Sequence, residues 1–167
     1  AYLNRELSEG DRVLCVGEAQ VFDAEVPLVY NTAFDRSIFQ EWAAVPEEGV
    51  PDSELGLRPV DEIRQKLHAE GVTHVLVNWS EIIRYRLTYG QKTFARPEVF
   101  TQLQQAGILG SPSVPSFQDW NKFWDNLSQR AQRRVEDLTA DLKATLGGES
   151  ILISAQVFPV IRSEEAD

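Results

Sequence analysis

The segment "PVDEIRQKLHAEGVTHVLVNW" (59–79) decides the fold, because a helix, a glycine stop and a buried strand follow one another in it. Pro59 suits the first turn of a helix over 59–71, and Gly71 ends that helix. The apolar stripe of this helix is expected to consist of Val60, Ile63 and Leu67. Residues 73–79 are apolar and rich in Val, which indicates a buried strand. A helix that returns directly into a strand is the second half of a βαβ unit, so we expect a parallel pairing with an earlier strand.

The earlier strand is predicted at 12–18, "RVLCVGE", which is short, apolar and closed by Gly17. A second strand is predicted at 25–31, and Pro27 places it at a sheet edge because proline has no N–H for a central ladder. The closing segment 150–161 reads as a strand or a strand pair.

The remaining helices follow from apolar spacing and capping residues. They are predicted at 35–44 with Asp35 as its cap, at 80–90 capped by Ser80, at 96–108, and at 117–146. The chain is therefore predicted to be α/β. We expect a three-layer, Rossmann-like domain with a small, mostly parallel sheet of three or four strands and a long C-terminal helix.

Composition limits the classes of function. The chain has 167 residues, which suits a single domain over 1–167. With 16 basic and 26 acidic residues its net charge is −10, which argues against nucleic acid and against adsorption to anionic lipid. The lone Cys15 excludes an internal disulfide, and no apolar run is long enough for a membrane span. His68 and His74 fall on different predicted elements, so no metal site is predicted.

Polar residues gather at the predicted carboxyl ends of the two parallel strands, where α/β proteins often bind ligands. The candidates for this crevice are Glu18, Asp35, Arg36, Asn78, Glu81, Arg84 and Tyr85. Three readings stay open: a structural network of arginines with Glu18, a binding crevice, and acid–base catalysis by two carboxylates. No dinucleotide fingerprint and no phosphate-binding loop is present, so no cofactor and no catalytic residue is assigned.

Two segments carry a family resemblance: "DRVLCVGEAQVFDAEVPLVYNTAFDRSIFQEW" (11–42) and "IRQKLHAEGVTHVLVNWSEIIRYRLTYG" (63–90). Together they resemble the soluble C-terminal domain of bacterial polytopic membrane glycosyltransferases, similar to the dolichyl-phosphate-mannose–protein mannosyltransferase and aminoarabinose-transferase group. The matching positions are Gly17, Glu18, Ala19, Pro27, Val29, Tyr30, Asn31, Thr32, Phe34, Asp35, 71–81, Arg84, Tyr85, Tyr89 and Gly90. Nothing in 110–150 takes part in the resemblance.

The resemblance implies a non-catalytic accessory domain on the extracytoplasmic face of a bacterial membrane, because the family's catalytic acidic residue lies among membrane helices that have no counterpart here. The absence of an initial Met agrees with a domain excised from a longer chain. Its partners would be the membrane-embedded part of the same parent chain and a glycan or lipid-linked sugar acceptor. The alternative is a stand-alone small α/β enzyme or nucleotide-binding protein that uses Glu18, Asn78 and Glu81.

Overall fold

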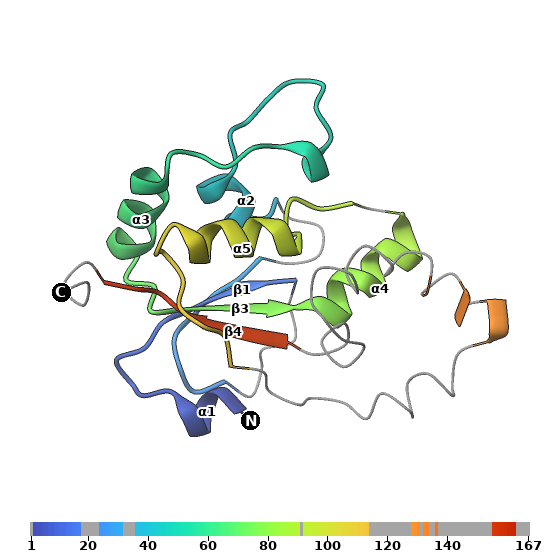
Figure 1. Cartoon of the computed structure of the whole chain (residues 1–167). Coiled ribbons are helices and arrows are strands. Elements are labelled where there is room, and N and C mark those ends of the chain that lie inside the picture. Colours follow the sequence, from blue (N-terminus) through green and yellow to red (C-terminus); the bar gives the residue numbers. More distant parts are fainter. Residues whose placement is uncertain are drawn as a thin grey trace.

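A computed structural model describes residues 2–17, 24–31, 36–90, 92–113, 128–130, 132–133, 136 and 155–162 (Figure 1). Helices and strands are interspersed along the described chain. The elements are α1 (Tyr2–Glu6), β1 (Val13–Val16), β2 (Leu28–Val29), α2 (Ile38–Ala43), the 3-10 turn η1 (Asp52–Glu54), α3 (Val60–Ala69), β3 (His74–Asn78), α4 (Trp79–Tyr89), α5 (Pro97–Gln105) and β4 (Ala155–Pro159). The α/β class predicted from the sequence is confirmed.

The four strands form one sheet in the order β2-β1-β3-β4. β1 is parallel to both β2 and β3, with Val13 opposite Leu28 on one side and opposite His74 on the other. β4 is antiparallel to β3. The mostly parallel sheet and the parallel pairing of β1 with β3 are therefore confirmed. β2 lies at the edge of the sheet, as predicted, but it spans only Leu28–Val29 of the predicted 25–31 and begins after Pro27.

The outer edge of β4 is occupied by the segment that follows α5. The backbone N–H of Gly110 donates to the carbonyl of Pro159, and Ser113 and Val157 exchange two backbone hydrogen bonds of 2.9 Å. Isolated bridges at Leu109–Val160 and Ser113–Val157 describe the same contact. Covering a strand in this way removes an edge on which another chain would pair.

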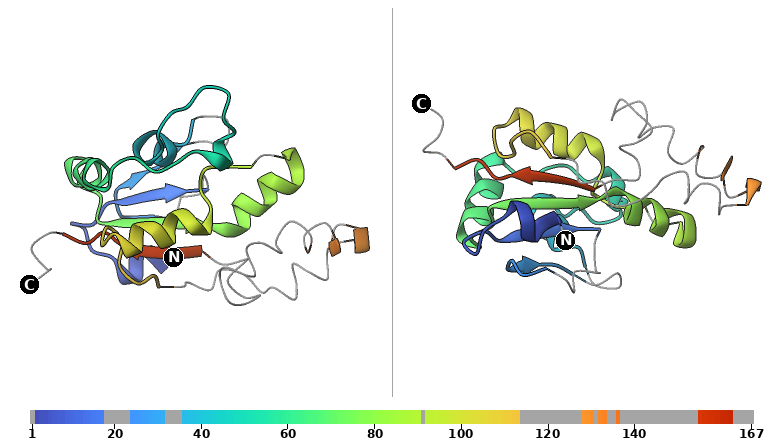
Figure 2. Two further views of the ribbon diagram at one scale, coloured as in Figure 1. Left: turned by 45° about the horizontal axis from the view of Figure 1, so that its top comes forward. Right: turned by 90° about the horizontal axis from the view of Figure 1, so that it is seen from below.

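Side chains alternate between the two faces of the sheet, as strand geometry requires. On one face Leu14, Val16, Val75, Val77 and Phe158 join the larger apolar cluster, which α2, α3 and α5 cover. On the other face a smaller cluster reaches Leu3 of α1. Figures 1 and 2 show the same arrangement, with α2, α3 and α5 on one side of the strands and α1 on the other.

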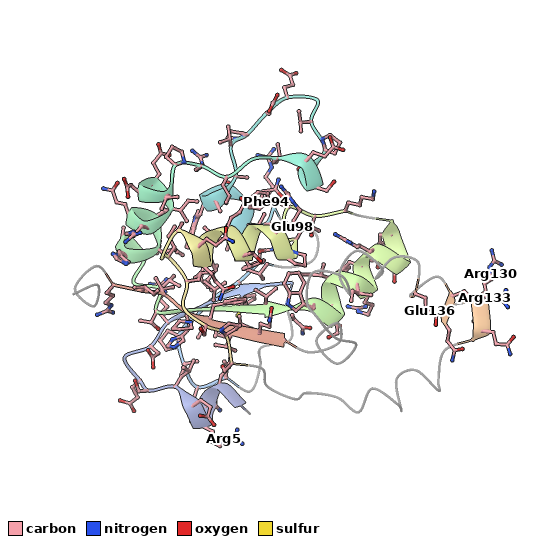
Figure 3. The ribbon with its side chains drawn as sticks, in the orientation of Figure 1. Arg5, Phe94, Glu98, Arg130, Arg133 and Glu136 are labelled. Carbon is pink, nitrogen blue, oxygen red and sulfur yellow. The ribbon has the colours of Figure 1, made fainter. Side chains whose placement is uncertain are left out.

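Phe100 of α5 is the centre of the larger cluster. Its ring is stacked with those of Phe39 and Phe158, with ring centroids 5.1 and 5.4 Å apart. With Trp79 it makes an edge-to-face contact, with centroids 5.5 Å apart. Phe94, labelled in Figure 3 ahead of α5, packs against Phe39 at 5.6 Å. Aromatic pairs at these separations add to the stability that burial alone provides.

Three local predictions are wrong. The cap of α2 is Ser37, whose side chain accepts the N–H of Gln40, and the helix begins at Ile38, so Asp35 is not its cap. The cap of α4 is Asn78 and not Ser80. Val60 is 36% exposed, and α3 buries only Ile63 and Leu67. Val60 is the first residue of α3, and the side chains that reach the sheet stand one and two turns further along.

Most of the predicted helix over 117–146 lies outside the described residues. Residues 129, 130, 132, 133 and 136 are helical, and Gln132 donates to the carbonyl of Ser128. The long helix therefore stays a prediction. Within the described part of the chain, no helix has the length and apolarity that crossing a membrane needs.

Candidate functional site

The candidate site lies where β1 and β3 end side by side. Val16, the last residue of β1, pairs with Val77, so Gly17 follows next to Asn78. β2 lies on one side of β1 and β3 on the other, and connections that leave in opposite directions create the point at which open α/β sheets often bind ligands. Asn78 therefore lies at the edge of the sheet where the crevice is predicted.

The space beside Gly17 is filled by α4. Gly17 has a φ of +74°, a conformation that residues with a side chain rarely adopt. A Cβ at this position would lie 2.5 Å from Cγ1 of Ile82 and 3.1 Å from the carbonyl oxygen of Asn78. Ile82 is buried, with 3% of its surface exposed. The first turn of α4 therefore packs directly onto the end of β1, where a bound group would otherwise approach the backbone.

Asn78 joins β3 to α4 through its side chain. Its Oδ1 accepts the N–H of Glu81 at 3.3 Å and the hydroxyl of Ser80 at 2.6 Å. An asparagine in this position stabilises a helix by about 1 kcal/mol relative to alanine, because it satisfies an N–H that has no partner within the helix. The helix begins directly after the strand for this reason, and Ser80 supports the cap without being the cap.

Glu81 and Arg84 form a fork-like ion pair on α4. The Nε of Arg84 donates to both carboxylate oxygens of Glu81 at 3.0 and 2.9 Å, and a second nitrogen of the guanidinium completes the pair. These hydrogen bonds raise the pKa of Arg84 above its ordinary value. The guanidinium also lies over the ring of Tyr85 at 4.8 Å, and Tyr85 stacks on Tyr89 at 6.0 Å.

The other candidates are not brought into this group. Glu18 and Asp35 lie outside the described residues, so the convergence of Glu18 with Asn78 stays a prediction. Arg36 is exposed on the loop before α2. It takes part in none of the contacts described above for Asn78, Glu81 and Arg84. The structure thus unites Asn78 with Glu81 through the helix cap, and Glu81 with Arg84 and Tyr85 through the ion pair.

Within the described residues, Asn78 and Glu81 take part in the cap and in the ion pair of α4, and the predicted network of arginines with Glu18 stays a prediction because Glu18 is not among them. The amide oxygen of Asn78 and both oxygens of Glu81 accept hydrogen bonds from their own helix. Within the described ranges, no three His, Cys, Asp or Glu side chains gather in a way that would hold a metal ion.

Sequence reasoning missed a buried polar contact at the same edge. The indole N–H of Trp79, which is fully buried, donates to Oε1 of Gln156 at 2.8 Å. Gln156 is the buried polar residue of β4 and stands opposite Val77. The signal was present as a glutamine inside the otherwise apolar run "AQVFP" (155–159), but its partner is 77 residues away in the chain.

A second polar group lies at the opposite end of the strands. Asp11 accepts the backbone N–H of Ser8 at 2.9 Å, and this bond lowers the pKa of the carboxyl. His74, the first residue of β3, places its Nδ1 2.9 Å from the hydroxyl of Thr73 and 3.6 Å from Asp11. Burial lowers the pKa of His74 below its ordinary value, and the charge of Asp11 opposes that shift only in part.

We expect the stability of the protein to fall as the pH drops below about 6.5, because the unfolded chain then binds a proton that folded His74 resists. The stability that neutral His74 contributes is fully present above that pH, and it is lost as the pH falls towards and through the lower pKa of His74 in the folded state. Urea unfolding at a series of pH values tests this. His74→Gln should flatten the profile in that range, and an unchanged slope in the variant would contradict the assignment to His74.

Comparison of the chain with protein-family models, with curated proteins and with solved structures found no match.

Proposed function

We propose that this chain is a non-catalytic accessory domain of a membrane glycosyltransferase-like protein. In this proposal it lies on the extracytoplasmic face of a bacterial membrane, where it packs on the membrane-embedded part of its parent chain or binds a glycan or lipid-linked sugar acceptor. The family part rests on the resemblance of 11–42 and 63–90 described above. The non-catalytic part rests on the contacts at the carboxyl ends of β1 and β3.

One observation carries the non-catalytic part: the first turn of α4 occupies the edge of the sheet at which a ligand would be expected. Ile82 approaches Gly17 so closely that a Cβ there would lie 2.5 Å from its Cγ1. The side-chain oxygens of Asn78 and Glu81 are bonded within α4. An enzyme of this class would need polar groups directed at a substrate, whereas these groups hold a helix on the end of a strand.

The fold proposal is finer than the α/β class alone. We propose a Rossmann-like domain of three layers with the long C-terminal helix over 117–146. Its support is the strand order β2-β1-β3, with parallel pairing on both sides of β1, and the placement of apolar clusters on both faces of the sheet.

The alternative, a nucleotide-binding protein or small enzyme that uses Glu18, Asn78 and Glu81, makes an opposite prediction about ligands. We expect titration calorimetry with nucleoside diphosphates, triphosphates and nucleotide sugars, with and without Mg²⁺, to show no saturable heat. The physical reason is that the chain has no glycine-rich phosphate loop and that Ile82 covers Gly17.

Two variants make this experiment decisive. Saturable binding that Glu18→Ala abolishes and Glu25→Ala leaves intact would contradict the proposal and favour the alternative. Glu25 is the matched control because it is an exposed glutamate on the segment that leads to β2. The membrane part of the proposal is tested separately by the complete gene product, which must contain apolar spans joined to this domain; a product without them would contradict it.

A further inference from the structure

We draw no further inference here: the strongest candidate, the side-chain cluster of Arg84, Tyr85 and Tyr89 on the outer half of α4, has its guanidinium paired with Glu81, and nothing in the described part of the chain shows what covers it.

Discussion

Replacing Gly17 by alanine is expected to lower the free energy of unfolding by about 2–4 kcal/mol, the sum of left-handed backbone strain and overpacking. The backbone at Gly17 has a φ of +74°, and the new Cβ would lie 2.5 Å from Cγ1 of Ile82. The carbonyl oxygen of Asn78 would also lie only 3.1 Å from the new methyl group, so relief of the contact requires a shift of α4 or of the end of β3. Urea unfolding followed by tryptophan fluorescence measures the loss.

Gly71→Ala is the control that isolates the contact with Ile82. Gly71 has a φ of +68°, and a Cβ there would meet nothing within 4 Å. It should therefore cost only the backbone strain, about 1–2 kcal/mol. Gly17→Ala combined with Ile82→Ala should lower the free energy of unfolding by less than the sum of the two single losses, because the clash is relieved. Equal effects of Gly17→Ala and Gly71→Ala would show that α4 does not press on the end of β1.

The buried pair of Trp79 and Gln156 is expected to give the second large effect. Trp79→Ala removes a fully buried indole that packs on Phe100, and it should cost about 3–5 kcal/mol. Gln156→Leu keeps most of the volume but leaves the indole N–H without its partner, which should cost about 1–3 kcal/mol. Both values are measured as differences in unfolding free energy.

A double-mutant cycle distinguishes the hydrogen bond from simple packing. Trp79→Phe removes the indole donor, and Gln156→Leu removes the acceptor. When both are replaced together, no polar atom of this pair stays buried without a partner, so the combined loss should be smaller than the sum of the two single losses. Strict additivity would mean that the 2.8 Å contact contributes nothing to stability beyond the volume of the side chains.

These two contacts explain how α4 is held at its base while its far end projects. Ile82 packs over the end of β1, Asn78 caps the helix, and Trp79 is bonded to β4. The first turn of α4 is therefore anchored to three separate parts of the sheet region.

Much of the fold was predictable because the decisive signals are local. The helix–glycine–strand unit over 59–79 predicted α3, β3 and the parallel pairing with β1, and the structure contains all three. Pro27 predicted the edge position of β2. Both signals depend on properties of single residues: glycine ends a helix, and proline lacks the N–H of a central ladder.

The candidate site was predictable in place and wrong in detail. Neighbouring parallel strands must end at the same edge, so Asn78 was correctly placed beside the end of β1. Whether Asn78 or Ser80 caps α4 is decided by where the backbone turns out of the strand, and both residues are acceptable caps. The sequence alone does not distinguish the two caps, because a helix that begins two residues later would have similar types of residue in its first turn.

By itself, then, the sequence determined the α/β class, the order of the strands and α-helices from β1 to α5, and the parallel pairing of β1 with β3, since these follow from spacing and from residues with restricted backbones. Only the tertiary structure decided that Ile82 covers Gly17, that Trp79 is bonded to Gln156, and that β4 runs antiparallel with its edge covered by the segment after α5. The physical reason is separation along the chain. Contacts between residues tens of positions apart depend on how whole helices and strands pack, and a local sequence pattern does not specify which distant residue will be the partner.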